Sequence, residues 1–596
     1  MQTFDTTSEQ YTIKKIYWER IFLHLVVTVE EGAMDPERFV LRRFSQSHDK
    51  VPREVYNKAM HVVEDPMVEK VVNGTVTMVK RTPNKRVAVN TIKEETSVIT
   101  EKTEDHIYDC MISIAAANGR SFLNNGNWQI VAILPNGDEH ICSLDYKVAE
   151  QKDDLSRVFR YNNNHMAYTL TFDFYNSKDG MLSFLMRSHF MIDNEKWGKY
   201  HSLAEAMTMK GKMKKLRHRM VCALINAYYH TVRFFTPKKG NRILFMTETK
   251  NYLWGNLKAV YDRVNERGLG EDYVISTSAR VAVGKHQSIR SWLKTITLIA
   301  KQDVIFVDDF VPIFEQFHLD PKTRLVQLWH AGEGFKAVGF CRFGKKGSPF
   351  PAGTCHKEYT NVITASKKLI HVFEEVFGIE RSAFLPYGMP RLDGFLDENN
   401  IEAFKEKFYG EHPDLKGKKV ILFAPTYRGT GQKSAYYPYD ELDLKQIYEY
   451  CGEDKVFLFK MHPFVSRKPK IPEDYRDRIQ DISSYPSIND LYYITDLLIT
   501  DYSSAFFEYA LMKRPVLFFT YDRERYELTR GVHRPVKETA PGKVCDSFEE
   551  MMKALYEKDF EAEKIDQFVK DNFGDYDGHA SDRIIDNIIL GKGQTK

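Results

Sequence analysis

Polar side chains that could do phosphate chemistry follow four apolar runs in the second half of the sequence. Each run reads as a buried strand, and parallel strands end at a common edge, so these side chains are expected to meet there. A lone histidine is more often a satisfied core residue, but two at equivalent positions favour a site. The runs and their followers are 326–328 before His330, 420–423 before Thr426 and Arg428, 456–459 before Lys460 and His462, and 497–500 before Asp501, Ser503 and Ser504.

The last of these runs opens the segment 497–522, around which the chain is organised. It reads as strand, sharp turn, helix to Lys513 and strand, with Ser503 or Ser504 as the helix N-cap. Hydroxyls and first-turn N–H groups there suit a pyrophosphate, and Glu508 lies one turn on, where a carboxylate could accept ribose hydroxyls. The alternative is an ordinary capped helix.

Alternating strands and helices surround these motifs and would position them. The first series has strands at 242–246, 273–276, 303–307, 324–328 and 361–364, with helices after 255–261, near 288–300 and capped by Ser366. The second has strands at 419–423, 455–459, 496–500 and 515–519. Such alternation predicts α/β domains with parallel, doubly wound sheets at 241–385 and 386–596, with a ligand cleft between them.

The first 200 residues have a different pattern. Alternating runs at 86–92, 128–134 and 166–175 are separated by Asn-Gly pairs at 73–74, 125–126 and 136–137, which are typical of antiparallel hairpins. This segment is predicted to be an accessory β-rich domain, such as a sandwich, without a catalytic constellation.

Residues 201–240 join the two patterns and begin with a basic run. A basic amphipathic helix can lie on an anionic membrane, although a solvated interdomain helix with a core-facing apolar side fits equally well. The residues expected at the membrane surface are Lys210, Lys212, Lys214, Lys215, Arg217 and Arg219.

Composition limits the other classes of function. The chain has 596 residues, enough for about three domains, and a net charge of only +3, which argues against a nucleic-acid partner. Seven cysteines without CxxC spacing favour a reducing compartment. The sequence shows neither an export signal nor a membrane-spanning run, so no membrane-spanning helix is expected.

The motifs WHAGEGFK, YGMPRLD, FAPTYRG, KMHPF and TDYSSAFFEYALMKRPVLFF, in this order, resemble the CDP-glycerol glycerophosphotransferase family of teichoic acid primases and polymerases. The resemblance covers about 240–590. It implies a GT-B-type fold of two Rossmann-like halves. It also implies transfer of a polyol phosphate, here expected to be glycerol phosphate, from a CDP-polyol to a lipid-linked acceptor at the cytoplasmic membrane face, with release of CMP. Gly388 and Arg391, within YGMPRLD, are expected to contact substrate. Relatives commonly read HGTPLK where this chain has HAGEGFK.

The residue types predict a different role in this reaction for each half. His330, on the acceptor half, is predicted to be the base, since imidazole titrates near working pH, and His462 to donate to the transferred phosphate. Arg428 and Lys460 are predicted to hold the pyrophosphate with Ser503 and Ser504. Thr426 and Asp501 complete the substrate-binding set. No metal site and no cofactor are expected, although Asp308-Asp309 ends a strand and leaves room for a cation.

Three other functions fit part of the pattern. They are ribitol phosphate transfer from CDP-ribitol, glycosyl transfer from a sugar nucleotide on the same fold, and a non-catalytic membrane-docking scaffold. The paired histidines with TDYSS favour phosphopolyol transfer, and the complete phosphate cradle argues against a scaffold. Homo-oligomerisation is left open.

Overall fold

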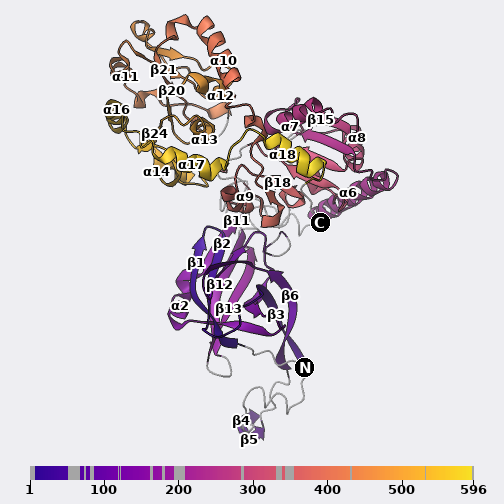
Figure 1. Cartoon of the computed structure of the whole chain (residues 1–596). Coiled ribbons are helices and arrows are strands. Elements are labelled where there is room, and N and C mark those ends of the chain that lie inside the picture. The colour runs from indigo at the N-terminus through magenta and orange to yellow at the C-terminus, as the bar shows by residue number, and fades with distance from the viewer. Residues whose placement is uncertain are drawn as a thin grey trace. The chain divides into compact units, whose positions relative to one another are not determined.

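The computed structural model describes most of the chain, which forms two compact units (Figure 1). The first unit ends at Ala204 and the second begins at Glu205. The described residues are 7–50, 67–72, 75–80, 86–117, 120, 122–161, 166–176, 181–192, 209–282, 287–330, 334, 339–341, 355–429, 432–529 and 532–592.

The N-terminal unit is β-rich, as predicted. Strands β2, β9 and β10 are mostly buried, and Trp128 is fully buried, with its indole N–H donating to Ser188 Oγ at 3.0 Å. The elements are β1 (Thr7–Glu19), β2 (Phe22–Val29), β3 (Arg38–Lys50), β4 (Met67–Val72), β5 (Thr75–Lys80), β6 (Arg86–Ser97), β7 (Ile99–Glu104), β8 (Ile107–Ser113), β9 (Gly126–Ile133), β10 (Glu139–Leu144), α2 (Tyr146–Glu150), α3 (Lys152–Leu155), β11 (Arg157–Tyr161), β12 (Met166–Asn176) and β13 (Leu182–Ile192).

The expected sandwich of two sheets is not what the strands form. Eleven of them hydrogen-bond into one sheet, which branches because β9 pairs with β3 on one side and with β10 and β13 on the other. The ladders are antiparallel except β1–β10, and a hairpin joins β9 to β10 through Asn136-Gly137. Strands β4 and β5 also pair antiparallel, while Asn73-Gly74 between them lies outside the described residues.

Helix α6 (Met209–Phe234) occupies the predicted junction and opens the C-terminal unit. Its last turns pack into the core: Tyr229 is fully buried and stacks on Phe317 at 4.7 Å, and Arg233 pairs with Asp320 at 3.3 Å. Its first turns expose an apolar row and Arg217. The row consists of Met209, Met213, Leu216, Met220 and Leu224. Among the described residues, no helix is apolar over a length that would cross a bilayer.

The first half of the C-terminal unit is built on six parallel strands in the order β15-β14-β16-β17-β18-β19. Uninterrupted burial along β14 and β16 is typical of a parallel sheet covered on both faces. Its elements are β14 (Arg242–Thr247), α7 (Gly255–Glu266), β15 (Val274–Ala279), α8 (Ile289–Ala300), β16 (Val304–Val307), β17 (Arg324–Gln327), β18 (Asn361–Ile363), α9 (Ile370–Phe377) and β19 (Phe384–Leu385), with short 3₁₀ helices at Pro312–Glu315, Gly339–Cys341, Cys355–Glu358, Lys367–Leu369 and Arg381–Ala383.

The second half repeats this plan, with six parallel strands in the order β22-β21-β20-β23-β24-β25. Two doubly wound halves in one unit confirm the predicted α/β, GT-B-like fold. The elements are α10 (Glu398–Glu411), β20 (Lys419–Phe423), α11 (Leu444–Cys451), β21 (Lys455–Phe459), β22 (Ile479–Asp481), α12 (Ile488–Leu491), β23 (Leu497–Thr500), α13 (Ala505–Ala510), β24 (Val516–Phe519), α14 (Arg523–Thr529), α15 (Val536–Thr539), β25 (Lys543–Cys545), α16 (Phe548–Glu557) and α17 (Lys564–Phe573), with short 3₁₀ helices at Pro390–Leu392, Pro413–Leu415, Gln432–Ser434, Tyr439–Glu441, Glu473–Tyr475 and Tyr492–Ile494.

The chain then returns to the first half. Helix α18 (Ala580–Ile584) and the π-helical turn Ile585–Ile589 bury Ile584 and Ile588 in the cluster that contains Phe245 of β14. Asp582 accepts from Arg263 of α7 at 3.0 Å. The predicted boundary at residue 386 therefore marks the first crossing between the halves, and the segment after α17 is a second one.

Three helix ends differ from the predictions. Helix α7 begins at Gly255, not after 255–261, because Leu257 and Val260 already pack in the core. Helix α13 ends at Ala510 rather than Lys513, whose φ of +53° breaks the helix before β24. Ser366 precedes a 3₁₀ turn but makes no capping bond, since its Oγ donates to the Asp571 carbonyl at 2.6 Å.

Candidate functional site

His330 lies three residues beyond the end of β17, at the carboxyl edge of the first sheet. The chain turns sharply there, with Trp329 at a φ of +44°. The turn is held by the buried Gln327, whose Oε1 accepts from the Trp329 N–H at 2.8 Å. From the start of α7, the Asn256 amide donates to the carbonyls of Leu328 and Trp329 at 3.1 and 2.6 Å. Both contacts fix the backbone that carries the imidazole.

The imidazole of His330 is oriented by the end of the neighbouring strand. Its Nδ1 lies 3.1 Å from the Asp308 carbonyl oxygen, which can only accept, so Nδ1 carries the proton of the neutral ring. The unprotonated nitrogen is then Nε2, the form that a general base requires. The side chain is 32% exposed, so substrate can reach it.

Two carboxylates lie beside this histidine. Asp309 Oδ1 is 3.9 Å from Nδ1. Asp308 is almost fully buried, and burial raises the pKa of its carboxyl group to about 6, with the charge of Asp309 acting in the same direction against the Thr247 hydroxyl and Lys250. The Asp308 carboxyl group therefore holds its proton to a higher pH than an exposed aspartate does.

Arg391 connects His330 to the second half. One arm of its guanidinium donates to the His330 carbonyl and the other pairs with Glu508 of α13, while its backbone N–H donates to Asn256 Oδ1 at 3.0 Å. The predicted Arg391 is thus brought together with His330 and Glu508. The Glu508 carboxylate, predicted to accept ribose hydroxyls, is held by Arg391 in this structure.

Arg428, Asp501 and Thr426 form one buried cluster between the ends of β20 and β23. Arg428 donates to Asp501 at 2.9 Å, to the Thr426 carbonyl at 2.6 Å and twice to Asp522 at 2.7 and 2.8 Å. Asp501 also accepts the N–H of Thr426 at 2.7 Å. Burial alone would lower the pKa of Arg428, but these carboxylates raise it, so the guanidinium stays charged.

This cluster favours a different role for Arg428 from the predicted pyrophosphate contact. Four guanidinium N–H bonds end on protein oxygens, the residue is 7% exposed, and four tyrosine rings surround it at 5.2–5.7 Å. Arg428 holds the loops after β20 and β23 in register. The rings belong to Tyr437, Tyr502, Tyr521 and Tyr526.

His462 follows β21, and the ring nitrogen that carries its proton is the opposite one to that of His330. Its Nδ1 accepts the Phe464 N–H at 3.1 Å, so the neutral ring carries its proton on Nε2 and can donate to an anion. The ring packs against Tyr427 at 4.8 Å. Lys460 is largely buried and donates to the carbonyls of Ser483 and Tyr485, so two of its three N–H groups support the loop after β22.

The hydroxyls of the predicted phosphate cradle lie at the start of α13. Ser503 Oγ accepts the Ala505 N–H at 3.3 Å, and Ser504 occupies the N-cap position without a side-chain capping bond. Both are partly exposed. Gly388 lies in the first crossing segment with a φ of +96°, and its N–H donates to the Thr364 carbonyl at 3.1 Å.

Comparison with known proteins identifies the family of this chain. Residues 228–590 match the model of the CDP-Glycerol:Poly(glycerophosphate) glycerophosphotransferase family. The chain belongs to this family. It is similar to two Staphylococcus aureus proteins, the teichoic acid ribitol-phosphate polymerase TarL (38% identity, 61% of this chain and 65% of TarL) and the teichoic acid ribitol-phosphate polymerase TarK (35%, 73% and 84%). The match to TarL thus spans slightly less than two thirds of that protein. A solved structure of the wall teichoic acid polymerase TagF aligns with 66% of the chain and all of TagF at 22% identity and a TM-score of 0.48.

Several residues at the site were not predicted from the sequence. Asn256 and Asp522 carry positioning contacts, and Asp308 was considered only as an end of a strand that might hold a cation. Asp522 follows the predicted strand 515–519, so the rule of reading strand ends could have found it. Asn256 lies at the start of a helix, for which that rule gives no signal.

Some predicted residues cannot be placed. Glu333, the acidic residue of HAGEGFK, lies outside the described residues, as do the side chains of Lys210, Lys212, Lys214 and Lys215. Arg217 and Arg219 are exposed on α6.

Proposed function

We propose that this protein transfers a polyol phosphate from a CDP-polyol to a hydroxyl of a lipid-linked acceptor or growing teichoic acid chain, and releases CMP. The observation that carries this proposal is the opposite orientation of the two histidines. His330 presents an unprotonated Nε2 and His462 a protonated one. The reaction requires a general base and a hydrogen-bond donor to the transferred phosphate.

The reaction then proceeds as a displacement at the phosphorus that carries the polyol. Nε2 of His330 takes the proton of the acceptor hydroxyl, whose oxygen forms a bond to this phosphorus. The bond from phosphorus to the bridging oxygen breaks, and CMP leaves with that oxygen. His462 Nε2–H and the hydroxyls of Ser503 and Ser504 donate to the phosphate oxygens, where negative charge accumulates.

The nucleotide is assigned to the second half. Ser503, Ser504 and Lys460 lie at its strand ends, and Glu508 accepts the ribose hydroxyls at Oε2 while its Oε1 stays paired with Arg391. Arg428, Thr426 and Asp501 support this site by fixing two of its loops. The catalytic role of Arg428 is therefore indirect.

The names of TarL and TarK favour ribitol over the glycerol predicted from the motifs. The lipid-linked acceptor is assigned to the cytoplasmic membrane face, where the exposed first turns of α6 supply a basic and apolar contact surface.

A CMP-release assay tests the proposal. The purified protein is incubated with a lipid-linked acceptor and either CDP-ribitol or CDP-glycerol, and CMP is measured over time. We expect acceptor-dependent CMP release, faster with CDP-ribitol. If CMP is released from neither donor, the proposal is contradicted, and release of UDP from a UDP-sugar would instead favour a glycosyltransferase.

A further inference from the structure

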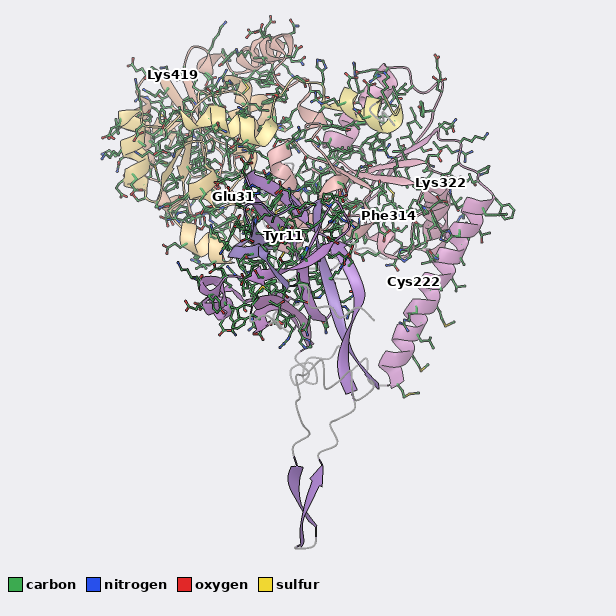
Figure 2. The ribbon with its side chains drawn as sticks, turned by 60° about the horizontal axis from the view of Figure 1, so that its bottom comes forward. Tyr11, Glu31, Cys222, Phe314, Lys322 and Lys419 are labelled. Carbon is green, nitrogen blue, oxygen red and sulfur yellow. The ribbon has the colours of Figure 1, made fainter. Side chains whose placement is uncertain are left out.

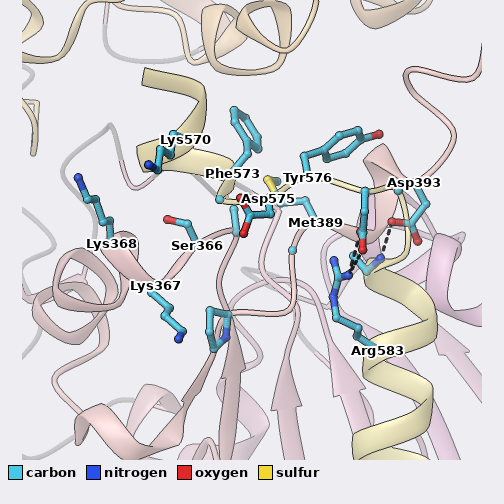
Figure 3. A pocket seen from close by; sticks show the side chains of 17 residues that line it. Ser366, Lys367, Lys368, Met389, Asp393, Lys570, Phe573, Asp575, Tyr576 and Arg583 are labelled. Atoms are coloured by element: carbon cyan, nitrogen blue, oxygen red, sulfur yellow. Dashed lines mark hydrogen bonds and ion pairs between the residues drawn. The ribbon is translucent and has the colours of Figure 1, made fainter. Parts of the chain in front are cut away.

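A cavity of about 500 Å³ lies beside the two segments that cross between the halves of the C-terminal unit (Figure 3). It is bounded by the carboxyl ends of β18 and β19 and by the end of α17. Since β18 neighbours β17, the cavity opens at the same sheet edge that carries His330. Its lining includes Ser366, Lys367, Lys368, Met389, Asp393, Lys570, Phe573, Asp575, Tyr576 and Arg583.

The walls of this cavity are fixed by contacts between the halves. Ser366 is tied to the Asp571 carbonyl at 2.6 Å, and Asp393 accepts the N–H groups of Ala580 and Ser581 at 2.9 and 2.8 Å. At Gly388, a Cβ atom would lie only 3.1 Å from the Cβ of Ala580, so the first crossing runs close against α18. These contacts therefore fix the shape of the cavity within the fold.

Charged groups of both signs face the cavity. Lys368 is paired with Asp571 at 2.5 Å and Arg583 with Asp577 at 2.6 Å. In the part of the chain that the structure describes, Lys367 and Lys570 make no ion pair. Figure 3 shows the three lysines on one side of the cavity and Asp393 with Arg583 on the other.

Apolar groups complete the lining. Phe573, Tyr576 and Met389 lie among the charged residues, and Asp575 is exposed at the rim. A ligand for such a surface carries anionic groups for the ammonium groups and hydroxyls for the carboxylate, separated by short carbon chains. A polyol phosphate polymer has this composition, and the volume lies in the range of small-molecule sites, enough for a short run of units.

We propose that this cavity binds the already polymerised part of the acceptor, with phosphodiesters on Lys367 and Lys570 and polyol hydroxyls on Asp575. The inference rests on the proposed function and deepens it, because it separates an acceptor-chain subsite from the donor site at Ser503 and Ser504. The chain end would leave the cavity toward His330 along the edge of one sheet.

The test compares two double variants, Lys367→Gln/Lys570→Gln and the control Lys322→Gln/Lys407→Gln, which removes two exposed lysines outside the cavity. CMP release is measured with an acceptor that carries one polyol phosphate and with one that carries about eight. For the cavity variant we expect the KM of the long acceptor to rise about tenfold. The KM of the CDP-polyol and turnover of the short acceptor should not change, and the control should resemble the wild type.

Binding of a fluorescent oligo(polyol phosphate), followed by anisotropy, gives a readout independent of turnover. The cavity variant should bind it about tenfold more weakly and with a smaller dependence on salt, and CDP should not displace it from the wild type. The proposal would be overturned if the cavity variant and the wild type had the same KM for the long acceptor. It would also be overturned if CDP displaced the oligomer. Absence of CMP release from the wild type would instead contradict the proposed function, and the anisotropy result would still decide whether the cavity binds the oligomer.

Discussion

Arg428 illustrates at the scale of single residues how charge is used in this protein. Its guanidinium is surrounded by Asp501, Asp522 and tyrosine rings, and it is nearly excluded from solvent. Removing one partner of a buried ion pair leaves the remaining charges uncompensated, which costs more than the pair itself contributes. The residue is therefore expected to affect stability more than ligand contact.

The substitution Arg428→Ala should lower the free energy of unfolding of the C-terminal unit by about 3–5 kcal/mol, because Asp501 and Asp522 lose their partner. Thermal unfolding followed by calorimetry measures this change, with the exposed Lys433→Ala as control. Unchanged stability combined with a large loss of CDP affinity would instead support a direct pyrophosphate contact.

Asp308 should make stability depend on pH. Its folded pKa of about 6 lies above the usual value of 3.8, so the native state binds a proton more tightly than the unfolded state. The resulting stabilisation is present below pH 4 and is lost as the pH rises through 6. Asp308→Asn should therefore gain stability over the wild type between pH 4 and 6, reaching on the order of 1–3 kcal/mol at pH 8. Equal pH profiles of the melting temperature in the two proteins would contradict this account.

At the scale of elements, helix α6 has one buried end and one exposed end. Its last turns are core, through Tyr229 and Arg233, whereas its first turns leave apolar side chains and Arg217 in solvent (Figure 2 labels Cys222 between these parts). The interpretation as a helix with a core-facing apolar side therefore holds for its last turns. The membrane role of the first turns stays a prediction.

Liposome sedimentation tests that role. Lys210→Gln, Lys214→Gln, Arg217→Gln and Arg219→Gln together should weaken binding to anionic vesicles by about a hundredfold or more, because each basic residue contributes about 1 kcal/mol. Binding by the wild type should fall with salt. Matched substitutions of exposed lysines elsewhere, at Lys322, Lys407, Lys416 and Lys433, should have little effect. Equal binding by the two quadruple variants would exclude the helix as the membrane contact.

At the scale of the whole molecule, specific side-chain contacts join the two halves of the C-terminal unit. Arg391 links the His330 carbonyl to Glu508, and a buried hydrogen bond joins His533 Nε2 to Glu375 Oε2 at 2.6 Å. In the proposed reaction such contacts would keep the base and the phosphate site in a reactive geometry, where a displacement of about 1 Å can cost about 10²-fold in rate.

Arg391→Lys should lower kcat about 10- to 100-fold, because one ammonium group cannot reach both partners of the planar guanidinium. CDP affinity, measured by calorimetric titration, should change much less, since Arg391 contacts the proposed nucleotide site through Glu508. A loss of affinity as large as the loss of kcat would place Arg391 on the nucleotide itself.

Local patterns in the sequence predicted the parallel strands and the positions of His330 and His462 well, because buried parallel strands are short apolar runs with polar ends. The role of Arg428 could not be read this way, since its partner Asp522 lies 94 residues away. The return of α18 to the first half and the branched sheet of β9 also depend on long-range packing, which local periodicity does not predict.

The orientation of His330 is the central claim, and single-turnover CMP release by His330→Ala tests it most directly. The variant should bind the CDP-polyol with unchanged affinity and release CMP about 10²- to 10⁴-fold more slowly, because the base is lost while the nucleotide site is intact. His462→Ala should lose both rate and affinity. Near-normal CMP release by His330→Ala would contradict the account.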